Sequence, residues 1–140
     1  MRKPDRIIGT DYLHRWHLIP RSRFFNIYLH KFIGSDDDRA LHEHPWWSVS
    51  FFLAGGPMRE RFQHNPPGSL KLYRTITRFR PYFRNTVIAH QMVKDTREPS
   101  WTLFITGPRV RLWGFWCPKG WVPWFEFVDR DQGGEGKGCE

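Results

Sequence analysis

Two histidines stand one residue apart where a strand is expected to begin. His42 and His44 open the sequence HEHPWWSVSFFL, which is rich in aromatic and β-branched residues. Residues two apart on a strand point to the same face, so both imidazoles can reach one metal ion at about 2.0–2.1 Å. His90, within TVIAHQMV, lies on a separate expected strand and is the best candidate for the next ligand. These three residues predict a metal site.

The sequence leaves open which metal binds and whether a further residue is a ligand. Glu60, in MRERF, could be a fourth ligand, or it could be the carboxylate of a site of two histidines and one carboxylate, although an exposed glutamate fits the same pattern. Three nitrogen ligands with open positions suit Fe, Zn, Mn, Ni or Cu. The other histidines are interpreted as hydrogen-bonded residues of the core or the surface; they are His14, His17, His30 and His64.

Four further residues could contact a substrate. Ser48 and Ser50 share the strand face of the paired histidines, where they could donate hydrogen bonds or simply leave room as small side chains. Arg109 and Arg111 alternate with apolar residues, and an inward arginine could bind a carboxylate or phosphate with two hydrogen bonds. Outward arginines are the commoner arrangement on a sheet, so both orientations remain open.

The elements that would position these residues are short strands separated by turns rich in glycine and proline. Strands are expected at residues 24–33, 46–53, 58–63, 70–79, 86–93, 101–107, 110–117 and 121–128. The turn AGGP joins the second and third of these into a hairpin-like unit, and only the region near residues 10–23 could hold a turn of helix. Many short strands at near-regular spacing predict an all-β sandwich or barrel.

The length of 140 residues corresponds to one domain. We expect an N-terminal extension at residues 1–23, a β-barrel at 24–128 and a tail at 129–140 with the composition of a disordered end. No run approaches the ~18 apolar residues of a membrane-spanning helix, and no apolar stretch follows the basic N-terminus, so we expect a cytoplasmic protein. Cys117 and Cys139 are expected to be free thiols.

The chain is basic, with 22 Lys and Arg against 14 Asp and Glu, a formal net charge of +8 and a pI of about 10. Such a balance suits anionic partners, including nucleic acids and nucleotides. The basic residues are spread along the chain and mostly alternate with apolar ones, as on the solvent face of a sheet. This distribution favours a solvated surface over a dedicated nucleic-acid site.

The layout of histidines and glycines resembles that of the cupins, which are small double-stranded β-helix (jelly-roll) barrels with a metal in the mouth or interior. Their first motif is G-x5-H-x-H-x3,4-E-x6-G, and their second is G-x5-P-x-G-x2-H-x3-N. The matching residues are His42, His44, Gly55 and Gly56 for the first motif and His90 for the second. Ser48 and Val49 stand where the family has Glu, and Asn85, Val87 and Lys94 replace the Pro, Gly and Asn of the second motif.

The resemblance covers roughly residues 25–117, and the wider pattern is also similar to small uncharacterised cupin-like proteins of bacterial and phage genomes. Without the glutamate, the site resembles the thiol dioxygenase branch, in which three neutral imidazoles hold ferrous iron. The resemblance therefore implies a mononuclear metal cupin, with Fe(II) favoured, that performs a dioxygenase-type oxidation on a small, anionic substrate. Two alternatives are a non-catalytic cupin that binds a small ligand or nucleotide and a sugar-nucleotide isomerase or epimerase. Cupins often pair through sheet edges, which implies a homodimer.

Overall fold

The computed structural model describes residues 2–8, 12–35, 41–42, 44–64, 72–86, 88–118, 120–127 and 138–139. Strands dominate these residues, and one short helix follows them. The elements are β1 (Arg6–Ile8), β2 (Leu13–His17), β3 (Asn26–Phe32), β4 (Leu41–His42), β5 (Ser48–Gly55), β6 (Met58–His64), β7 (Leu72–Thr75), β8 (Pro81–Arg84), β9 (Ile88–Lys94), β10 (Ser100–Thr106), β11 (Gly114–Cys117), β12 (Gly120–Pro123) and α1 (Trp124–Phe127).

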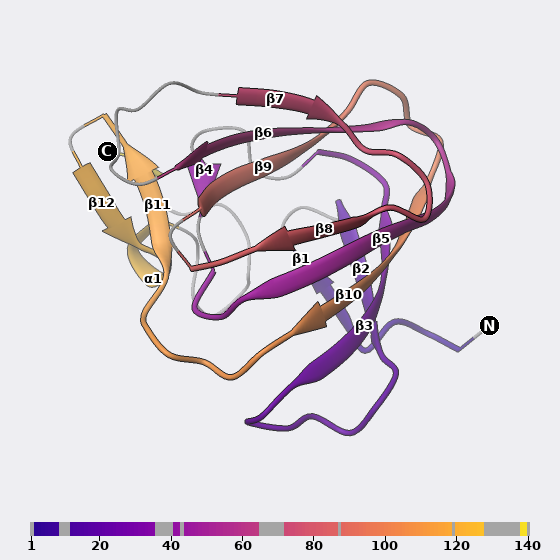
Figure 1. The fold of residues 1–140 in the computed structure, drawn as a ribbon, viewed down its shortest axis with the longest axis horizontal. Coiled ribbons are helices and arrows are strands. Elements are labelled where there is room, and N and C mark those ends of the chain that lie inside the picture. The colour runs from indigo at the N-terminus through magenta and orange to yellow at the C-terminus, as the bar shows by residue number, and fades with distance from the viewer. Residues whose placement is uncertain are drawn as a thin grey trace.

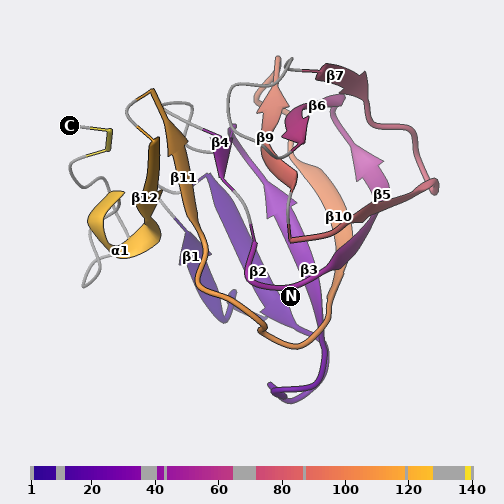
Figure 2. The same ribbon diagram turned by 60° about the vertical axis from the view of Figure 1, so that its left-hand side comes forward.

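The strands form two six-stranded antiparallel sheets that face each other (Figures 1 and 2). Sheet I has the order β1-β2-β3-β10-β5-β8, and sheet II has the order β12-β11-β4-β9-β6-β7. In Figure 1, β11, β12 and α1 lie at the left, away from the turns that join β5 to β6 and β9 to β10 at the right. This architecture is the all-β jelly roll that the sequence predicts.

Because side chains alternate along a strand, every second residue of β3 and β10 points into the interior. In β10 every second residue is buried, from Ser100 to Thr106, while the residues between them are only half-buried. β3 shows the same period, with Tyr28, His30 and Phe32 buried. The interior of the barrel therefore receives aromatic and polar side chains together, which is unusual for a purely structural core.

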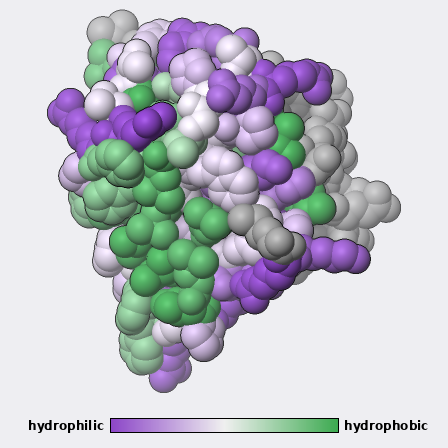
Figure 3. All heavy atoms as spheres, turned by 90° about the vertical axis from the view of Figure 1, so that its right-hand side faces the viewer, coloured by the Kyte–Doolittle hydropathy of each residue, from purple (hydrophilic) through white to green (hydrophobic). Residues whose placement is uncertain are grey.

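The outer face of sheet I is apolar. Leu103 of β10 lies between Leu29 of β3 and Phe51 of β5, and Ile105 continues the row two residues later. Figure 3, which views the molecule from the side of β3, β5 and β10, shows a broad hydrophobic area there. The period-2 pattern of these strands thus places apolar residues on both faces of the sheet.

The expected hairpin of residues 46–53 and 58–63 is wrong. β5 pairs with β10 and β8, whereas β6 pairs with β9 and β7, so the turn between them carries the chain from one sheet to the other. Gly55 in this turn has φ of +106°, and a Cβ there would lie 1.9 Å from the carbonyl oxygen of Pro99. Close packing of the turn against the β9–β10 connection therefore requires glycine.

Other local expectations also change. The turn of helix near residues 10–23 is wrong, because Leu13–His17 forms β2 and pairs with β3. β1 and β2 thus extend sheet I from within the segment that the sequence sets apart as an N-terminal extension. The last expected strand is divided, since β12 ends at Pro123 and α1 begins at the next residue. None of the described helices is long and apolar enough to cross a membrane.

The two cysteines are not free thiols. Cys117 of β11 and Cys139 form a disulfide with Cα atoms 5.4 Å apart. Two cysteines separated by 22 residues carry no sequence signal for pairing, because the link depends on Cys139 lying beside β11. Apart from Gly138 and Cys139, the segment 129–140 lies outside the described residues.

Candidate metal centre

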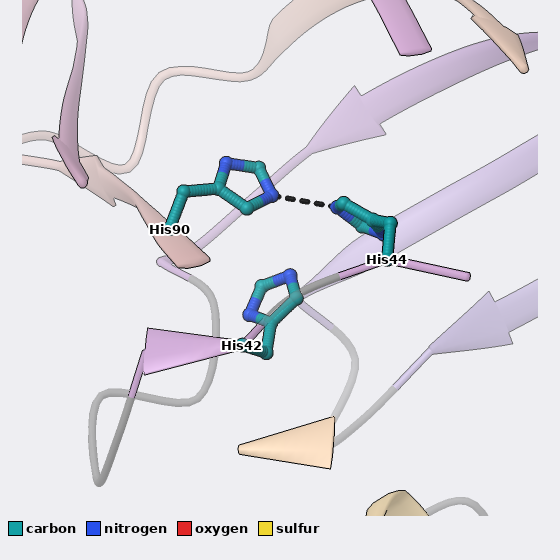
Figure 4. A group of neighbouring side chains, drawn as sticks. All are labelled: His42, His44 and His90. Carbon is teal, nitrogen blue, oxygen red and sulfur yellow. Dashed lines mark hydrogen bonds between the residues drawn. The ribbon is translucent and has the colours of Figure 1, made fainter. Parts of the chain in front are cut away.

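The three predicted ligands come together between the sheets. His42 is in β4 and lies directly opposite His90 of β9, and His44 follows two residues after His42. One ligand nitrogen from each residue lies within 4.8 Å of the other two. Figure 4 shows the three imidazoles turned toward a common point. The separation of Nε2 of His44 from Nε2 of His90 is 2.7 Å.

The residues after His44 explain why its imidazole is held in this place. A residue before proline is restricted to extended backbone, so Pro45 keeps His44 on the same face as the ligand two residues earlier. The carbonyl of Pro45 accepts a hydrogen bond from the amide of Val110 at 2.8 Å. The indole of Trp46 stacks on the His44 ring, with centroids 4.6 Å apart and planes at 11°.

A buried carboxylate sets the orientation of His90. Nδ1 of His90 lies 2.7 Å from Oε2 of Glu60, and the side chain of Glu60 is fully buried. An ionised carboxylate only accepts hydrogen bonds, so Nδ1 carries the proton and Nε2 presents its lone pair to the other histidines. This is the tautomer that a metal ligand needs, and a carboxylate behind a ligating histidine is a common arrangement in metal sites.

Two arginines keep Glu60 ionised. Nε of Arg84 donates to Oε2 of Glu60, and Arg74 contacts Oε1 at 2.5 Å. Burial alone would raise the pKa of Glu60, but the Arg84 guanidinium and the bond from His90 outweigh it and hold that pKa well below its usual value. Glu60 is therefore not the exposed residue that its sequence also allows, and its carboxylate contacts the Nδ1 edge of His90 instead of joining the three ligand nitrogens.

Two of the three imidazoles, those of His44 and His90, are held in their neutral form. Burial lowers the pKa of His44 well below its ordinary value, and the neighbouring His90 and His42 lower it further. The pKa of His90 falls to about 4 because burial outweighs the hydrogen bond to Glu60. Neutral imidazoles are the form that binds metal ions, so the donor set fits a divalent transition metal.

A cavity of about 250 Å³ opens beside the histidines. Its aromatic lining includes Tyr28, Trp46, Phe104 and Trp113, and its arginines are Arg6, Arg15, Arg21, Arg84 and Arg109. No aspartate or glutamate is found among the described residues that line it. A ligand bound here would meet apolar walls, the three imidazoles and an excess of positive charge.

No family model matches the chain, and no curated protein matches it in sequence. Solved structures do resemble it. A cupin domain from Bordetella pertussis has a TM-score of 0.50 at 16% identity, covering 76% of this chain and 97% of that one. The fold is that of a cupin.

Two enzymes share this cupin fold. The DMSP lyase DddQ from Ruegeria pomeroyi has a TM-score of 0.58 at 18% identity, covering 79% of this chain and 54% of that one. HEPD from Streptomyces albus, with 2-hydroxyethylphosphonate and Fe(II) bound, has a TM-score of 0.58 at 10% identity. The match covers 71% of this chain and 22% of that one. The chain thus spans about half of the first enzyme and less than a quarter of the second. Likeness at these identities concerns the fold.

Of the four residues expected to contact a substrate, only two line the cavity. Ser50 lines the cavity and accepts a hydrogen bond from Nη1 of Arg84 at 2.8 Å. Arg109 also lines the cavity, whereas Arg111 is exposed and donates to a backbone carbonyl. Ser48 is fully buried outside the lining, and its hydroxyl has no hydrogen-bond partner among the described residues.

The cavity residues that the sequence-based site lacks include His30 and Arg15. His30 is buried and hydrogen-bonded, as expected of a core histidine, but it also lines the cavity. Arg15 donates from Nε to Nε2 of His30 at 2.9 Å. The alternation in NIYLHKF, which places His30 between two inward aromatic residues, is the signal that could have found it. The side chain of His64 lies outside the described residues.

Proposed function

We propose that the protein binds one divalent transition metal through His42, His44 and His90 and oxidises a small anionic molecule in a dioxygenase-type reaction. The observation that supports this function best is the convergence of three imidazoles on a cavity with five arginines and no described acidic lining residue. When bound, ferrous iron would polarise the substrate and relay electrons from the substrate to O₂.

The chain itself would perform three tasks in that reaction. Glu60 holds His90 in the tautomer whose lone pair faces the ligand point. The arginines of the cavity neutralise the charge of the substrate and orient it. The aromatic walls limit the entry of water, which strengthens every electrostatic contact inside the site. The Fe(II) in HEPD favours iron here, and Zn, Mn, Ni and Cu remain the competing metals.

Elemental analysis of untagged protein tests the proposal when wild type is compared with the His42→Ala/His44→Ala variant. We expect close to one iron per chain in the wild type and its loss in the folded variant. Oxygen uptake in a screen of small anionic substrates would then identify the reaction. Stoichiometric zinc or nickel would retain the site but contradict an oxygenase.

The same preparations separate the alternative functions. A non-catalytic barrel that binds a small ligand or nucleotide would keep its ligand affinity after chelation, and folded protein without metal in either form would favour it. A sugar-nucleotide isomerase or epimerase would be indifferent to chelators. A homodimer is a separate proposal, and sedimentation at several protein concentrations measures it directly.

A further inference from the structure

A row of polar side chains crosses the inner face of sheet I, next to the three histidines. Arg6 of β1 is the register partner of Arg15 of β2, Arg15 is that of His30 of β3, and His30 is that of Thr102 of β10. All four residues line the cavity. Such a row is not required by the barrel, because the same positions on neighbouring strands could carry apolar residues.

Arg15 is the central cation of this row, and its guanidinium is held from two sides. Nε donates to Nε2 of His30, and Cζ lies 4.4 Å from the centroid of the Tyr28 ring. Burial lowers the pKa of Arg15 to about 10, so the group stays cationic near neutral pH. His30 is neutral there because burial lowers its pKa well below the usual value, and it therefore serves as the acceptor.

No acid among the residues that the structure describes balances this charge. Arg74 and Arg84 are paired with Glu60, and Arg59 is paired with Asp95. Among the described residues Arg15 forms no salt bridge, and its hydrogen bond to His30 uses only Nε. Its two Nη nitrogens therefore remain for a ligand. Even a half-buried guanidinium is costly without a counter-ion unless an anion binds it, which points to an anionic group of the ligand.

The position of the row relates this charge to the metal centre. The ring of Phe104 lies 5.0 Å from that of His30 and 6.0 Å from that of His44, measured between centroids. One aromatic ring therefore separates the Arg15–His30 pair from the ligands. A cavity of about 250 Å³ is smaller than the ~300–1,000 Å³ of drug-sized sites, so the ligand is a compact molecule.

We infer that Arg15 binds the anionic end of the substrate through its two Nη nitrogens, and that this end is a compact oxyanion, either a carboxylate or a phosphonate or phosphate. His30 is the positioning residue that fixes the guanidinium plane. The inference rests on the proposed function, in which the opposite end of the same molecule lies at the three histidines. A planar fork of two donors matches two oxygens of either oxyanion.

Calorimetric titration of the full chain with inorganic phosphate and with acetate tests this assignment. Each titration uses protein as purified and protein from which metal has been removed, because phosphate can also bind a metal. We expect binding in both preparations, weakened at least tenfold by Arg15→Gln and unchanged by Arg97→Gln, which removes an exposed arginine elsewhere on the molecule. The probe that binds more tightly identifies the class of oxyanion.

Further variants keep the test decisive. If Arg15→Gln does not fold, Arg15→Lys replaces it, and its single ammonium should still weaken binding because it cannot donate to two oxygens from a fixed plane. His30→Gln should bind the anion like the wild type, since its amide oxygen can accept from Nε of Arg15. His30→Phe should bind the anion more weakly, because it offers no acceptor to Arg15. Equal binding by wild type and folded Arg15→Gln, or no binding of either probe to the wild type, would overturn the assignment. Metal content in these variants tests the proposed function separately.

Discussion

Glu60 accepts a hydrogen bond from Nδ1 of His90 at 2.7 Å, and the same carboxylate oxygen is bonded by Nε of Arg84. The carboxylate thus connects a ligand on sheet II to a buried arginine on sheet I. Arg84 in turn donates to Ser50, which lines the cavity. One buried charge network therefore contacts both the three-histidine cluster and the cavity, and a change to one member should alter the hydrogen bonds of the others.

Substitution Glu60→Gln should weaken both metal binding and the fold. The amide can still accept from His90, but it leaves the buried Arg84 without a counter-ion, which should cost about 3–5 kcal/mol of unfolding free energy. Loss of the carboxylate behind a ligand typically reduces metal affinity about 10- to 100-fold. Denaturant unfolding and metal titration measure the two effects. Glu98→Gln, at an exposed site, serves as the control.

The metal-free protein should lose stability as the pH falls below neutrality. His30, His44 and His90 have lowered pKa values in the folded chain, so the unfolded chain takes up protons that the folded chain does not. Their contribution to stability is complete above the unfolded pKa of about 6.5 and is lost as the pH falls toward the folded value, which for His90 is about 4. The slope should approach ~1.4 kcal/mol per pH unit for each histidine.

Urea unfolding of chelated protein between pH 7.5 and pH 4.5 measures this slope. The variant His30→Phe, which keeps a ring in the same place, should show a slope smaller by about one histidine's share. A stability that does not change over this interval would mean that the imidazoles take up protons in the folded state as they do in the unfolded chain. That result would also remove the argument for neutral ligands.

The sequence is enough to predict that His42, His44 and His90 come together, but not which residues hold them in place. His42 and His44 are found because the period of a strand is two residues, so spacing alone puts them on one face. His90 follows from a histidine on a separate strand. Glu60 is visible as a candidate, but its role depends on the pairing of β6 with β9, which places Phe62, its neighbour two residues on, opposite His90. No local sequence pattern predicts which residues of β6 and β9 pair.

The role of Arg15 in the cavity also cannot be predicted from local sequence patterns. Arg15 lies in the segment 10–23, where the sequence also allows a turn of helix. Its contact with His30 exists because β2 is paired with β3 in a register that brings the two residues opposite each other. Long-range pairing also explains the disulfide. All-β character is predictable from local alternation, whereas the partner of each strand is not.

Two glycines with positive φ offer a matched test of the turn between the sheets. Gly55 has φ of +106°, with the carbonyl oxygen of Pro99 at 1.9 Å from the position of a Cβ, and Gly120 has φ of +127° with nothing within 4 Å. Both substitutions to alanine incur backbone strain of roughly 1–3 kcal/mol. Only Gly55→Ala adds a collision with backbone, so thermal unfolding should show a clearly larger loss for it than for Gly120→Ala. Equal losses would indicate that the turn can shift.

The disulfide should stabilise the barrel by holding the end of the chain on β11. Cys139 packs with a small cluster that contains Phe115, whose register partner is His42. Closing a loop of 22 residues reduces the entropy of the unfolded chain, which is worth roughly 3 kcal/mol. Cys139→Ser should lower the unfolding free energy by about this amount under oxidising conditions. Addition of a reducing agent should bring the wild type down to the level of the variant and leave the variant itself unchanged, and a wild type insensitive to reduction would contradict the link.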